Sequence, residues 1–215
     1  MKKIFIVLFW AFGLSVAAQE IAPKTFLWGV VTGIEQHRLS VQSIPLKVMT
    51  PESPLAGSER TGTPGALLGA FVRWQLTRDL AIQPELLFSY AQNKVRFYPE
   101  NILGRYRFMD VEIPLHFVVT NARKQLPLRA SFLFGGRIGW NFAANTSDKL
   151  ALLRERMAAD IGLGAEIRLR KYRIQPEIVY SYGLNNLHDY RNTLFDPGIS
   201  NVVRDRITIR VLVWR

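Results

Sequence analysis

Residues 109–119 carry an apolar side chain at every odd-numbered position, and read Met109-Asp110-Val111-Glu112-Ile113-Pro114-Leu115-His116-Phe117-Val118-Val119. The even-numbered positions include Asp110, Glu112 and His116. Successive side chains of an extended strand point to opposite faces, so this spacing separates an apolar face from a polar one. The stretch therefore predicts a β-strand that lies between two different environments.

The same period of two recurs along most of the chain, and clusters of Pro, Gly, Asn or Asp separate the runs. Only residues 147–157 suggest a helical period, and we expect them in a loop. The pattern predicts an all-β fold, an antiparallel up-and-down barrel of about eight strands. The expected strands lie near residues 25–38, 64–76, 80–92, 105–119, 127–140, 157–169, 172–185 and 204–214.

The predicted connections alternate between short turns and long loops. Short turns are expected at 77–79, 121–125 and 170–171, and long loops at 42–62, 93–104, 141–156 and 188–202. Short turns at one end and long loops at the other are typical of barrels that span a bacterial outer membrane.

The kind of polar residue indicates which face of the sheet meets lipid. A water-facing sheet surface would carry lysines, because the ammonium group is strongly hydrated. Lysines are instead expected in loops and turns, or at the first residue of a strand: Lys47, Lys94, Lys124, Lys149 and Lys171, with Lys24 at a strand start. The strands contain arginine and acidic residues, which suit a crowded interior. We therefore assign the apolar face to lipid and the charged face to the lumen.

The predicted lumen is close to neutral, with six acidic and six basic residues. They are Glu85, Asp110, Glu112, Asp160, Glu166 and Glu177 against Arg73, Arg129, Arg137, Arg168, Arg206 and Arg210. We expect Glu85, Glu112 and Glu177 to pair with arginines such as Arg129, Arg137, Arg206 and Arg210, and His116 to lie near Glu112. About eight strands enclose a space that side chains can fill, so a filled barrel is predicted instead of an open pore.

One internal repeat connects two of the strands. Residues 82–90 read Ile-Gln-Pro-Glu-Leu-Leu-Phe-Ser-Tyr, and residues 174–182 read Ile-Gln-Pro-Glu-Ile-Val-Tyr-Ser-Tyr. Each copy follows a short basic turn, so both strands should rise from the same rim. We interpret the repeat as two strands with equivalent packing environments in one barrel, not as a duplication of domains.

The first residues predict export. Lys2 and Lys3 precede an apolar run, and small residues end at Ala18, which is typical of a secretory signal peptide over residues 1–18. The barrel domain is then expected over 19–215, in the bacterial outer membrane and with both termini in the periplasm. Removal of the two lysines lowers the formal charge from +11 to +9. The chain contains no cysteine, so it forms no disulfide.

Aromatic and basic residues are expected at the two rims. Trp28, Trp74 and Tyr172 should lie near the periplasmic rim, and Tyr90, Trp140 and Tyr182 near the outer rim, because amphipathic rings favour membrane interfaces. The excess positive charge gathers at the short turns. Its residues form a candidate periplasmic docking rim: Arg78, Arg123, Lys124, Arg170 and Lys171.

Enzymatic, metal-dependent and nucleic-acid functions find little support. His37, His116 and His188 lack the spacing of a metal site, and no cofactor or small-molecule substrate is indicated. Ser131, His116 and Asp110 would be the one conceivable catalytic trio, but no Gly-x-Ser-x-Gly motif supports it. The arginines are spread through strands, without a basic helix or stacking platform for nucleic acid. We expect a protein that is not an enzyme.

The residues also resemble a known family. Glu112-Ile113-Pro114-Leu115 and Pro176-Glu177, with residues 181–187 reading Ser-Tyr-Gly-Leu-Asn-Asn-Leu, look like the PorT-type outer-membrane barrels of Bacteroidetes. The resemblance runs from about Phe26 to the end and departs at the terminus, where Arg215 follows Trp214. It implies an accessory barrel of type IX secretion and carries over no catalytic residue.

The leading hypothesis is a structural or accessory subunit of a secretion machine, with outer-membrane lipid and other secretion subunits as partners. A small passive, porin-like channel and a stand-alone surface-binding barrel are the alternatives. An outer-membrane lipid-modifying enzyme ranks last.

Overall fold

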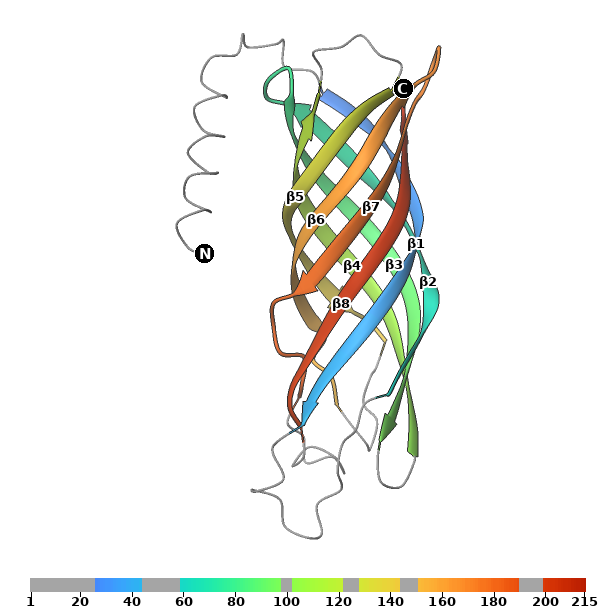
Figure 1. Ribbon diagram of the computed structural model, residues 1–215, viewed down its shortest axis with the longest axis vertical. Coiled ribbons are helices and arrows are strands. Elements are labelled where there is room, and N and C mark those ends of the chain that lie inside the picture. Colours follow the sequence, from blue (N-terminus) through green and yellow to red (C-terminus); the bar gives the residue numbers. More distant parts are fainter. Residues whose placement is uncertain (1–25, 44–58, 98–101, 122–127, 144–150, 190–198) are drawn as a thin grey trace.

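The chain closes into a barrel in which every strand is antiparallel to both of its neighbours (Figure 1). The computed structural model describes residues 26–43, 59–97, 102–121, 128–143, 151–189 and 199–215. Sequence neighbours pair throughout, and β8 returns to pair with β1. The predicted fold class is confirmed. The strands are β1 (Phe26–Ser43), β2 (Glu59–Gln75), β3 (Leu80–Phe97), β4 (Ile102–Thr120), β5 (Leu128–Asn141), β6 (Glu155–Arg168), β7 (Arg173–Gly183) and β8 (Ile199–Trp214).

Two ends of the barrel can be told apart by their connections. The short-turn end contains residues 76–79, 121 and 169–172, together with Phe26 and Arg215. The long-loop end contains the described residues of the connections after β5 and β7, which are 142–143, 151–154 and 184–189. In the short turn after β2, the Leu80 amide donates to the Thr77 hydroxyl at 3.1 Å, which ties the turn closed. Among the described residues, no helix is long and apolar enough to cross a membrane.

One predicted loop is wrong. Residues 93–104 are mostly strand, because β3 continues to Phe97 and β4 begins at Ile102. Lys94 was therefore misplaced: it lies within β3, opposite Arg105. These outward side chains are polar because they lie beyond the part of the barrel's outer surface that is apolar. Polar residues at a strand end resemble a loop in the sequence, which explains the wrong prediction. Lys171 lies in a turn as predicted, and Lys24, Lys47, Lys124 and Lys149 lie outside the described residues.

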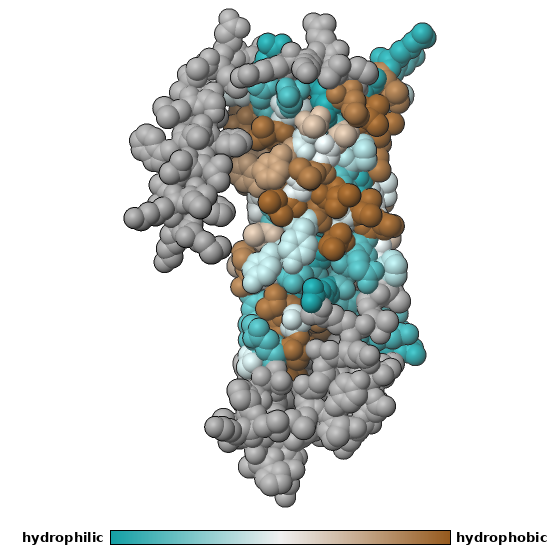
Figure 2. All heavy atoms as spheres, viewed as in Figure 1, coloured by the Kyte–Doolittle hydropathy of each residue, from teal (hydrophilic) through white to brown (hydrophobic). Residues whose placement is uncertain are grey.

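Exposed apolar side chains lie on all eight strands and form a band on the outside of the barrel, part of which is visible on the face drawn in Figure 2. On β4 it begins at Val119, passes through Ile113 and ends at Met109, so it spans about eleven residues. A tilted membrane strand needs about 9–11 residues. On β3 the band begins at Leu80 and ends at Tyr90. The band thus has the height of a bilayer core and lies nearer the short-turn end.

A polar collar continues the outer surface toward the long-loop end. We define the collar as the outward residues past the band on β1, β3, β4 and β8: Gln36, Arg38, Gln92, Lys94, Arg105, Arg107 and Asp205. Arg38 is register partner to Asp205, and Lys94 to Arg105. The strands are longer than the apolar band, so the barrel projects from it at this end.

The aromatic residues named from the sequence all face outward. At the short-turn end Trp28 is 76% exposed, and the Phe26 and Trp74 rings lie 6.2 Å apart. Tyr90 and Trp140 lie where the band meets the long-loop half, and Tyr90 is register partner to Met109. The final aromatic is different: Trp214 faces the lumen at 2% exposure, edge-on to Phe71 at 5.8 Å.

Apolar clusters also occupy the inside of the barrel. Near the short-turn end Val31, Leu67, Phe71, Leu87, Leu212 and Trp214 pack together. At the long-loop end a second cluster contains residues from the strands and from the connections after β5 and β7: Leu39, Tyr106, Phe108, Leu152, Leu187, Ile199 and Val202. Leu152 pairs with His188, which holds the two connections together over the lumen. The predicted signal peptide lies outside the described residues and stays a prediction.

We predict a depth-dependent cost for a charge on the outer face. Ile113→Arg, at the middle of the band, should lower the free energy of unfolding by about 2–4 kcal/mol, whereas Gln36→Arg in the collar should cost about 0–1 kcal/mol. Urea titration of the barrel folded in phosphatidylcholine vesicles measures both. Equal losses for the two variants would contradict the band and collar assignment.

Candidate functional site

The lumen contains a concentrated set of buried charges. Among the described residues seven carboxylates and six arginines are buried: Glu35, Glu85, Asp110, Glu112, Asp160, Glu166 and Glu177, and Arg73, Arg137, Arg156, Arg204, Arg206 and Arg210. Glu166 pairs instead with the half-exposed Arg168 at 2.8 Å. The remaining six carboxylates therefore face six arginines, and the interior is balanced.

The two copies of the sequence repeat form a clamp across the lumen. Arg210 on β8 contacts Glu85 of β3 and Glu177 of β7, each at 2.6 Å. Arg73 on β2 likewise donates to both Gln83, at 2.7 Å, and Gln175, at 2.9 Å.

Each glutamine in turn donates to the glutamate two residues further along its strand, at 2.7 Å on β3 and 2.8 Å on β7. The repeat thus places a Gln–Glu pair on each of two strands, and the two pairs bind the same two arginines, Arg73 and Arg210. This shared binding is the physical reason for the internal repeat in the sequence.

A chain of ion pairs continues from the clamp toward the long-loop end. The His116 ring bridges Glu85, at 3.0 Å, and Asp160, at 2.8 Å. Arg137 then connects Asp160, at 2.6 Å, with Glu112, at 2.8 Å. Residues far apart in the sequence are thereby linked in one hydrogen-bonded path.

Glu112 is the branch point of the path. It also accepts from Arg156 at 2.8 Å and from Arg206 at 2.5 Å. Arg206 reaches Glu35 on β1 at 2.8 Å, and Glu35 contacts His37. Together with the clamp, the path has members on all eight strands.

A separate pair lies nearer the long-loop end. Arg204 binds Asp110 at 2.5 Å, and its guanidinium lies 4.3 Å from the centre of the Phe108 ring. The Arg156 guanidinium donates to the Arg204 carbonyl at 3.2 Å, so the backbone connects this pair to the branched path.

Lumen glycines provide the room for these long side chains. A Cβ at Gly139 would lie 2.9 Å from Cγ of Glu112, and a Cβ at Gly164 would lie 2.8 Å from Cγ of Glu177. Either contact is too short for real atoms, so any larger residue would displace a carboxylate of the network. The glycines on the charged face are thus part of the packing of the charges.

Two predicted contacts and one predicted position in the lumen differ in the structure. Arg129 pairs with none of Glu85, Glu112 and Glu177; it is register partner to Glu166, at the short-turn mouth of the barrel. Arg168 also lies at that mouth, 37% exposed. His116 contacts Glu85 and Asp160 instead of Glu112. The alternation gives the face of each residue but not its height, and these residues share a face while lying at different heights.

Sequence reasoning missed Glu35, Arg156 and Arg204, all in ion pairs of the lumen. Arg204 has the phase of Arg206 and Arg210, and Arg156 lies just before an expected strand start with the phase of Asp160. Glu35 and Arg204 lie within expected strands, so the period of two already gave their face, and extension of the expected strand at 157 by one residue would have found Arg156.

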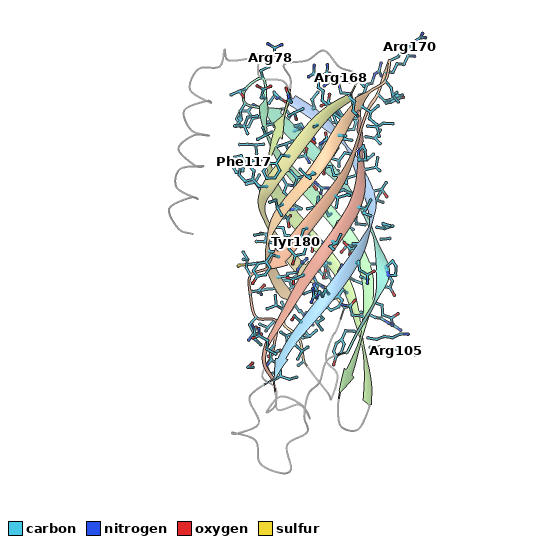
Figure 3. The ribbon with its side chains drawn as sticks, viewed as in Figure 1. Arg78, Arg105, Phe117, Arg168, Arg170 and Tyr180 are labelled. Atoms are coloured by element: carbon cyan, nitrogen blue, oxygen red, sulfur yellow. The ribbon has the colours of Figure 1, made fainter. Side chains whose placement is uncertain are left out.

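The predicted docking rim lies partly within the described residues. Arg78, Arg170 and Lys171 are exposed at the short-turn end, where Figure 3 labels both arginines. Arg123 and Lys124 lie outside the described residues. The rim points away from the lumen network.

The conceivable catalytic trio is not assembled. Ser131 accepts a hydrogen bond from Gln175, His116 binds Glu85 and Asp160, and Asp110 binds Arg204. The described residues also contain no group of three or more His, Cys, Asp or Glu side chains that could hold a metal. The arrangement supports paired, immobile charges.

We predict that Glu177→Leu lowers the free energy of unfolding by about 3–5 kcal/mol, because it leaves Arg210 buried with one carboxylate fewer. Glu155→Leu removes the same charge from an exposed position and should cost far less. Heat-dependent gel mobility and urea titration measure both variants. Wild-type resistance of Glu177→Leu would contradict a stabilising lumen network.

The comparisons agree with this architecture. The sequence matches the family model for the outer membrane protein beta-barrel domain over residues 17–189. No curated protein matches significantly. Among solved structures, the outer membrane protein OprG from Pseudomonas aeruginosa is similar, with a TM-score of 0.53 and 10% identity over 91% of this chain and 97% of that chain.

A second solved structure, Neisserial surface protein A, has a TM-score of 0.46 and 11% identity over 89% of this chain and 99% of that chain. At such low identity the OprG likeness concerns the fold alone. Because the family match spans most of the chain, the protein belongs to the outer membrane protein beta-barrel domain family and is an eight-stranded barrel of the outer membrane.

Proposed function

We propose that the protein is a non-conducting, non-enzymatic barrel that serves as a structural or accessory subunit of an outer-membrane assembly. The observation that carries the proposal is the filled lumen. A path of ion pairs and hydrogen bonds with members on all eight strands crosses the interior, and apolar clusters lie near both ends of it. A passive channel needs a hydrated path, whereas these side chains are packed and paired with one another.

The resemblance to PorT-type barrels supports a protein secretion machine, type IX, as the assembly. That resemblance rests on short motifs: Glu112-Ile113-Pro114-Leu115 in β4, and Pro176-Glu177 in β7. The family match is broader than this group and is equally compatible with other outer-membrane barrels. Recovery of the barrel from native outer membranes in mild detergent, with identification of what accompanies it, tests the assignment.

The orientation we propose puts the short-turn end in the periplasm. Short periplasmic turns and longer outer loops are the usual arrangement of such barrels. Phe26 and Arg215 would then both lie on the periplasmic side. The polar collar would rise above the outer leaflet, among the polar groups that its arginines and lysine favour.

We propose the basic rim as the docking surface for an acidic periplasmic partner. Arg78, Arg170 and Lys171 are exposed there, with no role in the lumen network. Attraction at such a surface acts over a Debye length of about 8–10 Å and weakens with salt.

We predict that the purified barrel forms no porin-sized conductance in planar bilayers, since Arg137, Arg206 and Arg210 hold carboxylates across the lumen. Detergent-only additions serve as the blank. Stable, reproducible single-channel steps from pure protein would overturn the subunit proposal and put the porin-like channel first.

We also predict that changing Arg123, Lys124, Arg170 and Lys171 to Gln leaves insertion normal while co-purification of partners and secretion fall together. The matched control changes four basic collar residues to Gln: Arg38, Lys94, Arg105 and Arg107. A normally inserted rim variant with unchanged partners and unchanged secretion would sink the docking role. Equal losses in rim and collar variants would show that overall charge, and not the rim, is responsible.

A further inference from the structure

The mouth of the barrel at the short-turn end has an excess of positive charge, whereas the charges of the interior are balanced. A hollow of about 190 Å³ opens there. Its lining includes one carboxylate and five arginines from four strands and a turn: Glu166, with Arg73, Arg78, Arg129, Arg168 and Arg173. We call this hollow the mouth pocket. Arg73 already belongs to the balanced interior, so the other four arginines and Glu166 leave an excess of three positive charges at the mouth.

Two of these arginines have nitrogen atoms that are buried without a partner. Arg73 forms the floor of the pocket at 3% exposure, and its Nη2 has no hydrogen-bond partner. The Nε of Arg129 is likewise buried and unsatisfied. An unsatisfied buried donor is costly, and a donor attached to a charged group is more so. Both nitrogens belong to residues that line the pocket, where an anionic ligand would place acceptor atoms beside their guanidinium groups.

The lone carboxylate leaves most of the charge unmatched. Glu166 accepts from Arg168 at 2.8 Å and lies 3.8 Å from Arg173. Arg73 is held by Gln83 and Gln175, and its guanidinium lies 4.8 Å from the centre of the Trp214 ring. Its position is therefore fixed before any ligand binds, which lowers the entropic cost of binding.

The chemistry of the lining identifies the class of ligand. Guanidinium groups bind carboxylates through planar, paired hydrogen bonds. The pocket lies inside the barrel wall, whereas the headgroups of surrounding lipids lie outside it. A flexible polypeptide can reach the barrel axis and insert acidic side chains into a hollow of this size.

We infer that the mouth pocket binds carboxylates of an acidic polypeptide segment, with Arg73 as the fixed anchor and Arg129, Arg168 and Arg173 around it. The inference deepens the proposed docking function, since it gives the partner's chemistry and a recessed site beyond the exposed rim. It is tested on the purified barrel and so does not depend on which assembly the barrel joins.

The test measures binding of a fluorescent hexaglutamate peptide to the full barrel in a neutral detergent, by anisotropy. Hexaglutamine is the uncharged control peptide. Arg129→Gln with Arg173→Gln should weaken hexaglutamate binding about tenfold or more, because charge-assisted hydrogen bonds are lost. Arg105→Gln with Arg107→Gln removes the same charge from the collar and should change the affinity less than about twofold.

Several outcomes would overturn the inference. They are equal binding of hexaglutamine, equal weakening by the mouth and collar variants, or competition by inorganic phosphate as strong as that by free glutamate. Heat-dependent gel mobility confirms that each variant is folded. The two proposals fail in different ways. Single-channel steps would contradict the subunit proposal but would not prevent measurement of peptide binding. Absence of peptide binding would contradict the mouth-pocket inference but not the proposal of a non-conducting barrel.

Discussion

The pairing of Arg210 with Glu85 and Glu177 is the interaction on which the rest of the interior depends. A guanidinium removed from water is stable only if carboxylates compensate its charge, and here two strands on either side of the lumen each supply one. Glu85 also binds His116, and contacts from His116 to Asp160 and from Arg137 to both Asp160 and Glu112 extend the network to Glu112. Because these carboxylates, arginines and His116 each have a partner on another strand, the network connects the strands of the wall from within. The same pairing fills the middle of the lumen with packed, paired side chains.

The outside of the barrel obeys a different constraint, the thickness of the membrane. The strands are longer than a bilayer requires: β4 contains 19 residues, of which about eleven form the apolar band. The surplus becomes the polar collar, where Lys94 and Arg105 face each other on paired strands. Backbone pairing continues there because closure satisfies every strand edge, whether lipid or water lies outside. The apolar cluster of Leu39, Tyr106, Phe108 and Leu187 then covers the charged network at the projecting end.

With the lumen filled and the wall in lipid, the surfaces open to a partner lie at the two ends. The short-turn end differs from the interior in its charge, since arginines gather both on its exposed rim and around the mouth pocket. The deep lumen needs its arginines for stability, whereas the mouth holds more of them than its single glutamate can compensate. That contrast separates structural charge from charge suited to binding, and it locates the proposed function at the mouth and rim.

The sequence by itself determined the strands, the face of each residue and the overall balance of charge, because period-2 alternation is a local property of extended chain. It placed Glu112 and Arg137 in the lumen and Ile113 against lipid. It could not give the height of a residue along the barrel axis. Height depends on strand tilt and on the stagger between neighbouring strands, which only closure of the barrel fixes. For this reason Arg129 and Arg168, expected among the buried pairs, lie at the mouth, while Glu35, Arg156 and Arg204 lie in the interior. The tertiary structure alone decided that Arg210 would meet Glu85, 125 residues away, and that the two copies of the repeat would close on the same arginines.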